Sequence, residues 1–237
     1  MLTFAIGDVH GHLELLAGLM RSIDGAAGGR PHRIVCLGDY VDRGPDSAGV
    51  IALLRERQAM AGRGRFVCLK GNHEDMLLAA TRGGLDEIAW LENGGDGCLA
   101  SFGVAATADL PEDVVAWIEA CPTYFEDASR AFVHAGLDPT RDRLDQSDES
   151  RLWIRQPFLE GDHDFGRFVV HGHTPQRSGE PDVRRHRVNL DTAAAYGGPL
   201  TAAVFEDGSG PPVSFLQVLP GRPASGGARP GQKREGA

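Results

Sequence analysis

Residues 33–44 read RIVCLGDYVDRG and join an apolar run to a polar turn flanked by glycines. The apolar part has about the length of a buried strand and is rich in β-branched residues, so it predicts a strand. The turn brings two carboxylates and a guanidinium to the carboxyl end of that strand. Ligands bind at this edge in open α/β sheets, so the stretch predicts both the fold class and the position of a site.

Four other runs share this form: residues 2–7 (LTFAIG), 65–70 (RFVCLK), 130–134 (RAFVH) and 167–171 (RFVVH). Segments of helical period over 12–23 and 47–62 separate the runs 2–7, 33–38 and 65–70. This alternation predicts βαβ units and a partly parallel sheet.

The remainder divides into a helical middle and a strand-rich end. Residues 74–122 read as helical with glycine interruptions at 83–84 and 94–97, and a further helix is expected over 111–120. The pattern after residue 165 is strand-rich, with a hairpin turn at 207–210. Residues 220–237 cannot bury anything, so we expect one domain over 1–219 followed by a disordered tail.

Composition excludes several classes of protein. With 237 residues, 41% hydrophobic and 24% charged, the chain is not disordered, collagen-like or a disulfide scaffold. No apolar run has the length of a membrane span, and the net charge of −9 gives no basic footprint for nucleic acid or an anionic membrane. The N-terminus reads as a strand and not as a signal peptide. Four widely spaced cysteines without a CxxC pair predict buried thiols in a reducing, cytoplasmic environment.

Short polar motifs follow the five predicted strands. They are GDVHG (7–11), GDYVDRG (38–44), GNHE (71–74), HAG (134–136) and HGHT (171–174). Their aspartate, asparagine and histidine side chains should meet at one edge. This donor set lacks thiolates and suits Mn, Fe or Zn in a catalytic role. Two cations about 3.5–4 Å apart would clamp the oxygens of a phosphoryl displacement, with a water between them as the nucleophile.

Phosphoryl transfer has two further requirements, and the sequence offers candidates for both. Arg43 and Arg155 can supply the positive charge that the equatorial phosphate oxygens need. His73 can donate a proton to the leaving oxygen, and Asp42 can orient that histidine. The residues therefore predict metal-dependent hydrolysis of a phosphoric ester.

The ordered motifs resemble those of the metallophosphoesterase (calcineurin-like) superfamily, and more narrowly the bacterial and phage form of the phosphoprotein (serine/threonine) phosphatase family, over residues 3–206. The resemblance implies a four-layer α/β/β/α sandwich and two metal ions, commonly Mn, Fe or Zn. It implies that the first ion is held by Asp8, His10 and Asp39, with Asp39 bridging, and that Asn72, His134 and His173 complete the second site. It also implies phosphate binding by Arg43 and Arg155, with His73 as general acid and Asp42 as its partner.

The implied activity is hydrolysis of phosphoserine or phosphothreonine in proteins, with phosphotyrosine also considered, by direct attack of a metal-bridging hydroxide. The expected partners are a phosphorylated protein or a small phosphoester, with no nucleic acid, membrane or regulatory subunit. The alternative is a diadenosine tetraphosphate hydrolase, because a related branch carries the same metal motifs. A stacking aromatic for adenine would favour it, and Tyr40, Trp153 or Tyr196 could provide one. A catalytically silent module and a nuclease are disfavoured, because no ligand is substituted and the chain is acidic.

Three positions depart from the family pattern or lack a role. His171 stands where eukaryotic members carry arginine, and we leave it out of the ligand set. Ala193 replaces a glycine of the bacterial segment, so the backbone is expected to differ slightly there. The stretch 90–95 (WLENGG) also resembles small bacterial members, and we interpret it as a helix end with glycine caps.

Overall fold

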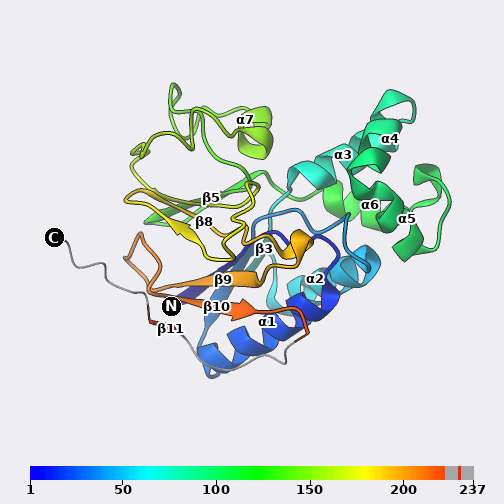
Figure 1. The fold of residues 1–237 in the computed structure, drawn as a ribbon. Helices are drawn as coiled ribbons and strands as arrows, with labels where there is room; N and C mark the ends of the chain where they lie inside the picture. The colour runs from blue at the N-terminus through cyan, green and yellow to red at the C-terminus, as the bar shows by residue number, and fades with distance from the viewer. Residues whose placement is uncertain (222–228, 231–237) are drawn as a thin grey trace.

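The structure is a computed structural model that describes residues 1–221 and 229–230 (Figure 1). Two mixed β-sheets lie face to face, and helices cover their outer sides. This is the four-layer α/β/β/α arrangement that the resemblance implied. Most of the disordered tail predicted for 220–237 lies outside the described residues and stays a prediction, but residues 229–230 pair with residues 214–215 as a short strand.

The larger sheet has six strands, and its centre is parallel. In spatial order it contains β11 (Arg229–Pro230), β10 (Ser214–Val218), β9 (Leu200–Phe205), β1 (Leu2–Ile6), β2 (His32–Cys36) and β3 (Phe66–Cys68). Strands β1, β2 and β3 are parallel, whereas β9 and β10 run antiparallel to their neighbours. The parallel part and the β9–β10 hairpin confirm the partly parallel sheet and the hairpin turn at 207–210 that the sequence predicted.

The smaller sheet has five strands and also mixes both directions. In spatial order it contains β4 (Tyr124–Glu126), β5 (Arg130–Val133), β6 (Phe168–His171), β8 (Arg187–Asn189) and β7 (Asp182–Val183). Strands β5, β6 and β8 are parallel, and β4 and β7 are antiparallel edge strands. The predicted strands 130–134 and 167–171 therefore belong to a second sheet and do not extend the first.

Helices form the outer layers and a cluster at one end of the sandwich. They are α1 (Leu13–Ala27), α2 (Ser47–Ala61), α3 (Asn72–Ala80), α4 (Leu85–Trp90), the turn η1 (Leu91–Gly95), which is kinked at Gly94, α5 (Asp96–Phe102), η2 (Thr107–Asp109), α6 (Glu112–Glu119), α7 (Asp148–Trp153) and η3 (Ala194–Tyr196). Helices α1 and α2 pack on the larger sheet, and α7 lies over the smaller one (Figure 1). The glycines at 83–84 separate two helices as expected. Gly94, with a non-helical φ of 102°, makes a kink within the predicted interruption at 94–97, just before α5 begins at Asp96.

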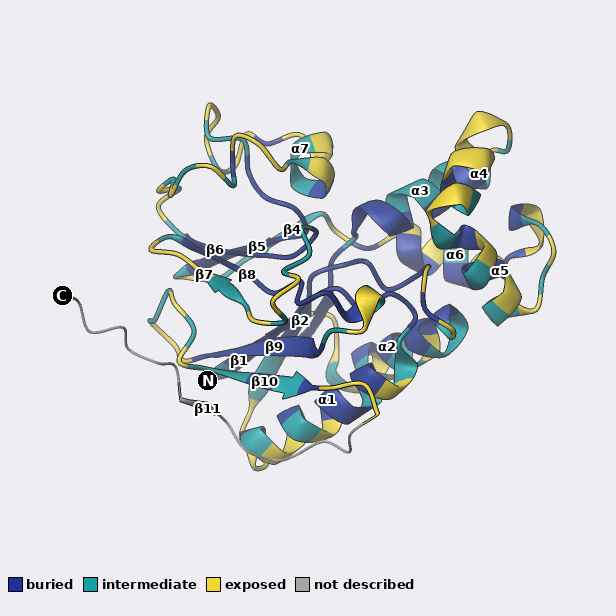
Figure 2. Ribbon diagram, viewed as in Figure 1, coloured by how far each residue is buried: buried dark blue, intermediate teal, exposed yellow. Residues whose placement is uncertain are grey.

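The core has two main layers because the central strands are buried on both faces. Alternate residues of β1 and β2, such as Phe4 and Ile34, pack toward α1 and α2. Their neighbours Ala5 and Val35 pack between the sheets against residues such as Val170. Figure 2 shows that burial extends into the loops beyond the strand ends, which carry the predicted site.

Two expectations from the sequence concern the cysteines and membrane-spanning helices. All four cysteines are free and buried, as expected. Within the described part of the chain, no helix is both long and apolar enough to cross a membrane.

Candidate active site

The predicted site residues follow strand ends in both sheets. Asp8 and His10 come after β1, the turn 38–44 comes after β2, and Asn72 and His73 open α3 just beyond β3. His134 and His173 follow β5 and β6 in the smaller sheet. The side chains are therefore gathered from the edges of two facing sheets and not from one edge. All six predicted metal ligands are buried, as are His73 and Asp42, whereas Arg43 and Arg155 are exposed.

Backbone strain is concentrated at these positions. Six non-glycine residues in the described chain have φ in the left-handed region, which disfavours residues with a Cβ. Five of them are predicted site residues: His10 (44°), Asp39 (52°), Asp42 (70°), Arg43 (65°) and His173 (67°). The sixth is Ala193 (64°). Strain of this kind persists only where the surroundings fix the backbone, and it is typical of functional sites.

The second predicted ion site contains two acceptors that face each other. Nδ1 of His134 lies 3.0 Å from the carbonyl oxygen of Leu37, so Nδ1 donates, and burial lowers the pKa of His134 and keeps the ring neutral. Nε2 of His134 is then an acceptor, yet it lies 2.9 Å from Oδ1 of Asn72. Oδ1 of Asp39 is 3.4 Å from the same nitrogen. Lone pairs that converge in this way need a cation between them.

His173 belongs to the same cluster. Its Nδ1 lies 2.9 Å from Oδ1 of Asn72, and burial lowers the pKa of His173 to about 3. Its Nε2 is buried and has no partner among the described residues. The ligand atoms of Asp39, His134 and His173 lie within 4.8 Å of one another. The residues of this cluster therefore fit a divalent cation.

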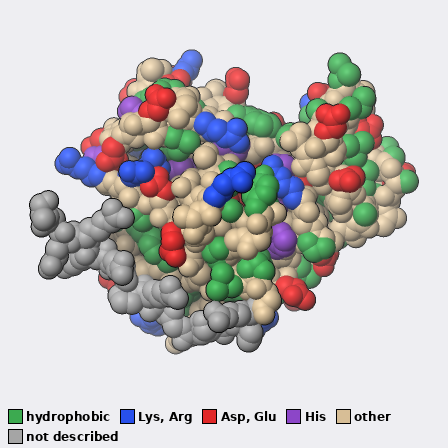
Figure 3. All heavy atoms as spheres, viewed as in Figure 1, with side chains coloured by type: hydrophobic (Ala, Val, Ile, Leu, Met, Phe, Trp, Pro, Cys, Tyr) green, Lys and Arg blue, Asp and Glu red, His purple; other side chains and the backbone are tan. Residues whose placement is uncertain are grey.

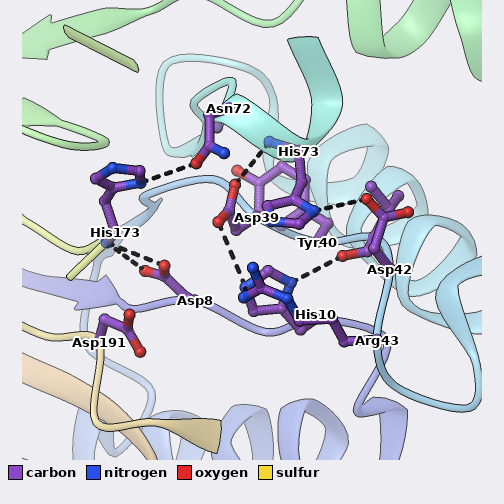
Figure 4. A network of polar contacts seen from close by, with 12 residues as sticks. Asp8, His10, Asp39, Tyr40, Asp42, Arg43, Asn72, His73, His173 and Asp191 are labelled. Atoms are coloured by element: carbon purple, nitrogen blue, oxygen red, sulfur yellow. Dashed lines mark hydrogen bonds and ion pairs between the residues drawn. The ribbon is translucent and has the colours of Figure 1, made fainter. Parts of the chain in front are cut away.

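In the first predicted ion site, as in the second, a backbone carbonyl oxygen holds Nδ1 of a histidine and leaves Nε2 as an acceptor. Nδ1 of His10 lies 3.0 Å from the carbonyl oxygen of Val41, which leaves a lone pair on Nε2. Nε2 faces Oδ2 of Asp39 at 3.4 Å (Figure 4). Burial lowers the pKa of His10 to about 3, so the ring is neutral and ready to bind a metal. Nη1 of Arg43 lies 2.9 Å from the same Nε2.

Several buried carboxylates lie close to Asp39, and a bound cation would stabilise their charges. Burial acts to raise the pKa of Asp39, but the surrounding histidines outweigh burial and hold that pKa below its usual value. Burial raises the pKa of Asp8 well above its usual value, and the charges of Asp191 and Asp39 raise it further. Burial likewise raises the pKa of Asp191 to about 7. Carboxylates this close together cannot all ionise unless positive charge is added.

Asp8 lies slightly apart from its predicted partners. Its Oδ2 accepts a hydrogen bond of 3.0 Å from the backbone nitrogen of His173. The ligand atoms that cluster with His10 and Asp39 within 4.8 Å come instead from His73. Figure 4 shows Asp8 on the side of the site nearest His173 and Asp191. His171, which we left out of the ligand set, packs its ring against Phe158 and belongs to neither cluster.

His73 and Asp42 form a close pair. Nδ1 of His73 lies 2.6 Å from Oδ2 of Asp42, and the backbone nitrogen of His73 donates to Oδ1 of Asp39 at 3.1 Å. Burial acts to lower the pKa of His73, but the carboxylates of Asp39 and Asp42 outweigh it and raise that pKa. With Nδ1 held by Asp42, the ring can keep a proton on Nε2.

Exposed side chains surround this buried centre. Arg155 lies close enough to His134 and His173 for its charge to lower the pKa of both. The ring of Trp153 is 42% exposed and meets that of His173 edge to face at 6.2 Å. Tyr196 is 57% exposed, and the guanidinium groups of Arg43 and Arg177 lie 5.6 and 5.8 Å from its ring centre. Basic and hydrophobic side chains lie next to one another near the centre of the face in Figure 3.

Tyr40 is not available for stacking. It is fully buried, and its hydroxyl donates to the carbonyl oxygens of Cys36 and Leu69. Of the three aromatic residues considered from the sequence, Trp153 and Tyr196 alone are exposed.

Three site residues were not identified from the sequence. Glu74 is fully buried, and its carboxylate accepts hydrogen bonds from the backbone nitrogens of Asp39, Tyr40, Val41 and Gly71. Asp191 faces Asp8, and Trp90 donates to Asp42. The motif GNHE contains Glu74, but nothing in its pattern indicates that this side chain organises the Asp39 loop.

Comparisons with known proteins agree with this geometry. A family profile described as calcineurin-like phosphoesterase matches residues 1–202. Serine/threonine-protein phosphatase 1 of Salmonella typhimurium is 29% identical over 211 residues, which cover 84% of this chain and 90% of that protein. Bis(5'-nucleosyl)-tetraphosphatase PrpE (asymmetrical) of Oceanobacillus iheyensis is 28% identical in a match that covers 92% of each chain.

A solved structure supports the fold. A crystal structure provisionally named a diadenosine tetraphosphatase superposes with a TM-score of 0.69 and 23% identity, and the match covers 92% of this chain and 93% of that one. At this identity the likeness supports the fold alone. The family match over most of the chain, together with the two His/Asp clusters that can hold metal ions, identifies the chain as a member of the calcineurin-like phosphoesterase family and a metal-dependent phosphoric ester hydrolase.

Proposed function

We propose that the protein is a two-metal phosphatase whose main substrates are phosphoserine and phosphothreonine in proteins, with phosphotyrosine also accepted. The proposed metal ligands are Asp8, His10 and Asp39 for one ion and Asp39, Asn72, His134 and His173 for the other. Manganese is the expected metal in vitro, with iron or zinc as alternatives. The four buried, free cysteines support a reducing compartment such as the cytoplasm.

The chain's own residues have separate tasks in this proposal. Cations bound at the two clusters would activate water and neutralise phosphate charge. Arg43 and Arg155 bind and orient the phosphate from the exposed side. His73 holds a proton on Nε2 for the leaving oxygen, and Asp42 fixes the orientation of that ring.

The observation that carries the proposal is the 2.6 Å contact between His73 and Asp42. The alcohol released from phosphoserine is a weak acid, so its oxygen needs a proton as the P–O bond breaks. The phosphate-type group released from a dinucleoside tetraphosphate is already a stable anion and needs no such donor. A general acid that the fold holds this firmly therefore favours an alkyl phosphate ester.

A second candidate is hydrolysis of a dinucleoside tetraphosphate. Trp153 and Tyr196 are exposed next to proposed site residues, Trp153 beside His173 and Tyr196 beside Arg43. Exposed aromatic rings next to a phosphate site can stack on a base, and Arg177 would add positive charge for further phosphates.

A substrate comparison tests the two candidates. With Mn²⁺, kcat/KM would be measured on phosphoserine, phosphothreonine and phosphotyrosine peptides and on diadenosine tetraphosphate. We expect the phosphoserine and phosphothreonine peptides to be preferred. A preference of tenfold or more for the dinucleotide, lost in Trp153→Ala or Tyr196→Ala, would overturn the protein-phosphatase proposal in favour of the second candidate. Leu144→Ala, which changes an exposed side chain away from the site, is the matched control.

A further inference from the structure

The segment 90–95 (WLENGG) had no role in the sequence interpretation beyond a helix end. In the structure it contains the last residue of α4 and the turn η1, where Gly94 is non-helical and makes a kink between two helices. Trp90 is fully buried, and its Nε1 lies 3.1 Å from Oδ1 and 3.0 Å from Oδ2 of Asp42.

The indole group fixes the carboxylate that in turn fixes His73. Trp90 can only donate, and His73 contacts Oδ2 of Asp42, one of the two oxygens that Trp90 also contacts, at 2.6 Å. The backbone of Asp42 is held as well, since its nitrogen donates to Oγ of Ser47 at 3.0 Å. A buried carboxylate held by two side-chain partners has little freedom to rotate, so the indole fixes Asp42 and, through Oδ2, the orientation of the His73 ring.

Neighbouring atoms lie so close to the two glycines of the segment that neither position has room for a side chain. A Cβ on Gly95 would lie 2.4 Å from Cδ2 of Trp90, so any side chain there would displace the indole. Gly94 has φ 102°, and its carbonyl oxygen accepts a hydrogen bond of 3.3 Å from the backbone nitrogen of Arg43. A Cβ on Gly94 would lie 2.9 Å from that same nitrogen. The segment therefore contacts both Asp42 and Arg43.

We propose that Trp90 is a positioning residue for the general acid, and that residues 90–95 hold the Asp42–Arg43 turn in its strained left-handed conformation. The indole N–H orients Asp42, Asp42 orients His73, and Nε2 of His73 is thereby aimed at the leaving oxygen. This inference rests on the proposed role of His73 and goes beyond it, because Trp90 touches neither substrate nor metal.

Trp90→Phe tests the inference, because it keeps an aromatic ring and removes only the N–H group with part of the indole. Loss of a hydrogen bond to a buried carboxylate should lower kcat on a phosphoserine peptide by about ten- to hundredfold, with KM within about twofold. On 2,4-dinitrophenyl phosphate, whose leaving group needs no proton, kcat should fall by less than about threefold. A purely structural role would lower both rates alike.

Two comparisons separate this inference from the proposed function. Trp117→Phe is the matched control, because Trp117 is also buried and its Nε1 donates to Gln58 at 3.1 Å away from the acid; we expect unchanged kinetics. In a His73→Asn background, Trp90→Phe should cost less than about twofold more, since the group it positions is gone. If His73→Asn itself shows no dependence on the leaving group, the proposed acid fails, whatever Trp90 does.

Equal losses on both substrates, or the full loss in the His73→Asn background, would overturn the role of Trp90. Should Trp90→Phe fail to fold, the indole N–H signals of the intact protein provide the test by NMR. The Trp90 signal should shift in Asp42→Ala while the Trp117 signal stays in place. An unmoved Trp90 signal would show that the contact does not form in solution.

Discussion

Nη1 of Arg43 lies 2.9 Å from Nε2 of His10, the ring nitrogen that also faces Asp39. Because Nδ1 of His10 faces a backbone carbonyl, Nε2 carries the lone pair, and the guanidinium donates into it. A metal ion and Arg43 therefore compete for one atom. We infer that Arg43 would leave His10 if a cation occupied this position, and that its guanidinium would then be free to contact phosphate.

Arg43→Gln should separate phosphate binding from metal binding. Loss of the guanidinium should lower kcat/KM by about ten- to a hundredfold and weaken inhibition by inorganic phosphate, because a charged hydrogen-bond donor is lost. The affinity for Mn²⁺ should stay equal or increase, because the competitor for Nε2 of His10 is removed. Steady-state kinetics and calorimetric titration with Mn²⁺ would measure the two effects.

The control for this variant is Arg55→Gln. Arg55 lies on α2 and pairs with Asp113 at the surface, so neither measurement should change. A fall in Mn²⁺ affinity of Arg43→Gln as large as its fall in kcat/KM would contradict the competition and would mean that Arg43 supports the metal site.

Removal of metal should abolish activity and lower stability. Thorough chelation with EDTA leaves the converging acceptors around Asn72 and Asp39 without positive charge, so turnover should vanish and Mn²⁺ should restore it. Because the ion binds the native state, adding Mn²⁺ should also raise Tm with a dependence on its concentration. Activity assays and thermal scans at several Mn²⁺ concentrations check both. Turnover that survives thorough chelation would contradict the two-metal proposal.

Asp39 is the carboxylate shared by both clusters, so its substitution should weaken the binding of both ions. Asp39→Asn should reduce kcat by at least about a hundredfold and reduce the bound Mn²⁺ per chain, because a neutral amide cannot bridge two cations as a carboxylate does. Elemental analysis after gel filtration measures the stoichiometry. Asp24→Asn, at an exposed pair with Arg57, is the matched control. A rate of Asp39→Asn near that of the wild type would contradict the proposal that Asp39 bridges the two ions.

Much of the fold followed from local patterns. The apolar runs before the polar motifs, such as residues 33–37 before Asp39, became buried strands, and the helical periods over 12–23 and 47–62 became α1 and α2. These patterns are readable because strand and helix periods are set by local geometry. The polar motifs were likewise placed correctly at strand ends, because each ligand lies within a few residues of its strand.

Contacts between distant segments could not be read in this way. Trp90 is 48 positions from Asp42, and Glu74 is 35 from Asp39, so no local period links them. The pairing of β5 with β6 in a second sheet is also a long-range contact, because the sequence of an apolar strand does not indicate which strand it pairs with. The left-handed residues Asp42 and Arg43 also contact distant segments, since Trp90 donates to Asp42 and the carbonyl oxygen of Gly94 accepts from Arg43.

Ala193 shows how this chain accommodates a departure from the family pattern. It has φ 64°, and its backbone nitrogen donates to Oδ1 of Asp191 at 3.0 Å. The alanine therefore keeps the left-handed conformation that glycine adopts without cost. The carbonyl oxygen of Ala193 accepts from Tyr196 and Gly198, so the strained residue closes the turn that presents Tyr196.

Ala193→Gly should stabilise the protein, against the usual direction of an alanine-to-glycine change. Relief of the left-handed strain outweighs the greater entropy of the unfolded glycine chain, so the free energy of unfolding should rise by roughly 0.5–1 kcal/mol and Tm by roughly 1–4 °C. Ala52→Gly is the matched control: Ala52 is exposed within α2, where glycine should lower stability by about 1 kcal/mol. Urea denaturation of both variants with Mn²⁺ present measures the difference. If Ala193→Gly is destabilised as much as Ala52→Gly, the turn at Ala193 is not strained in solution, and the substitution of alanine for glycine there has no energetic consequence.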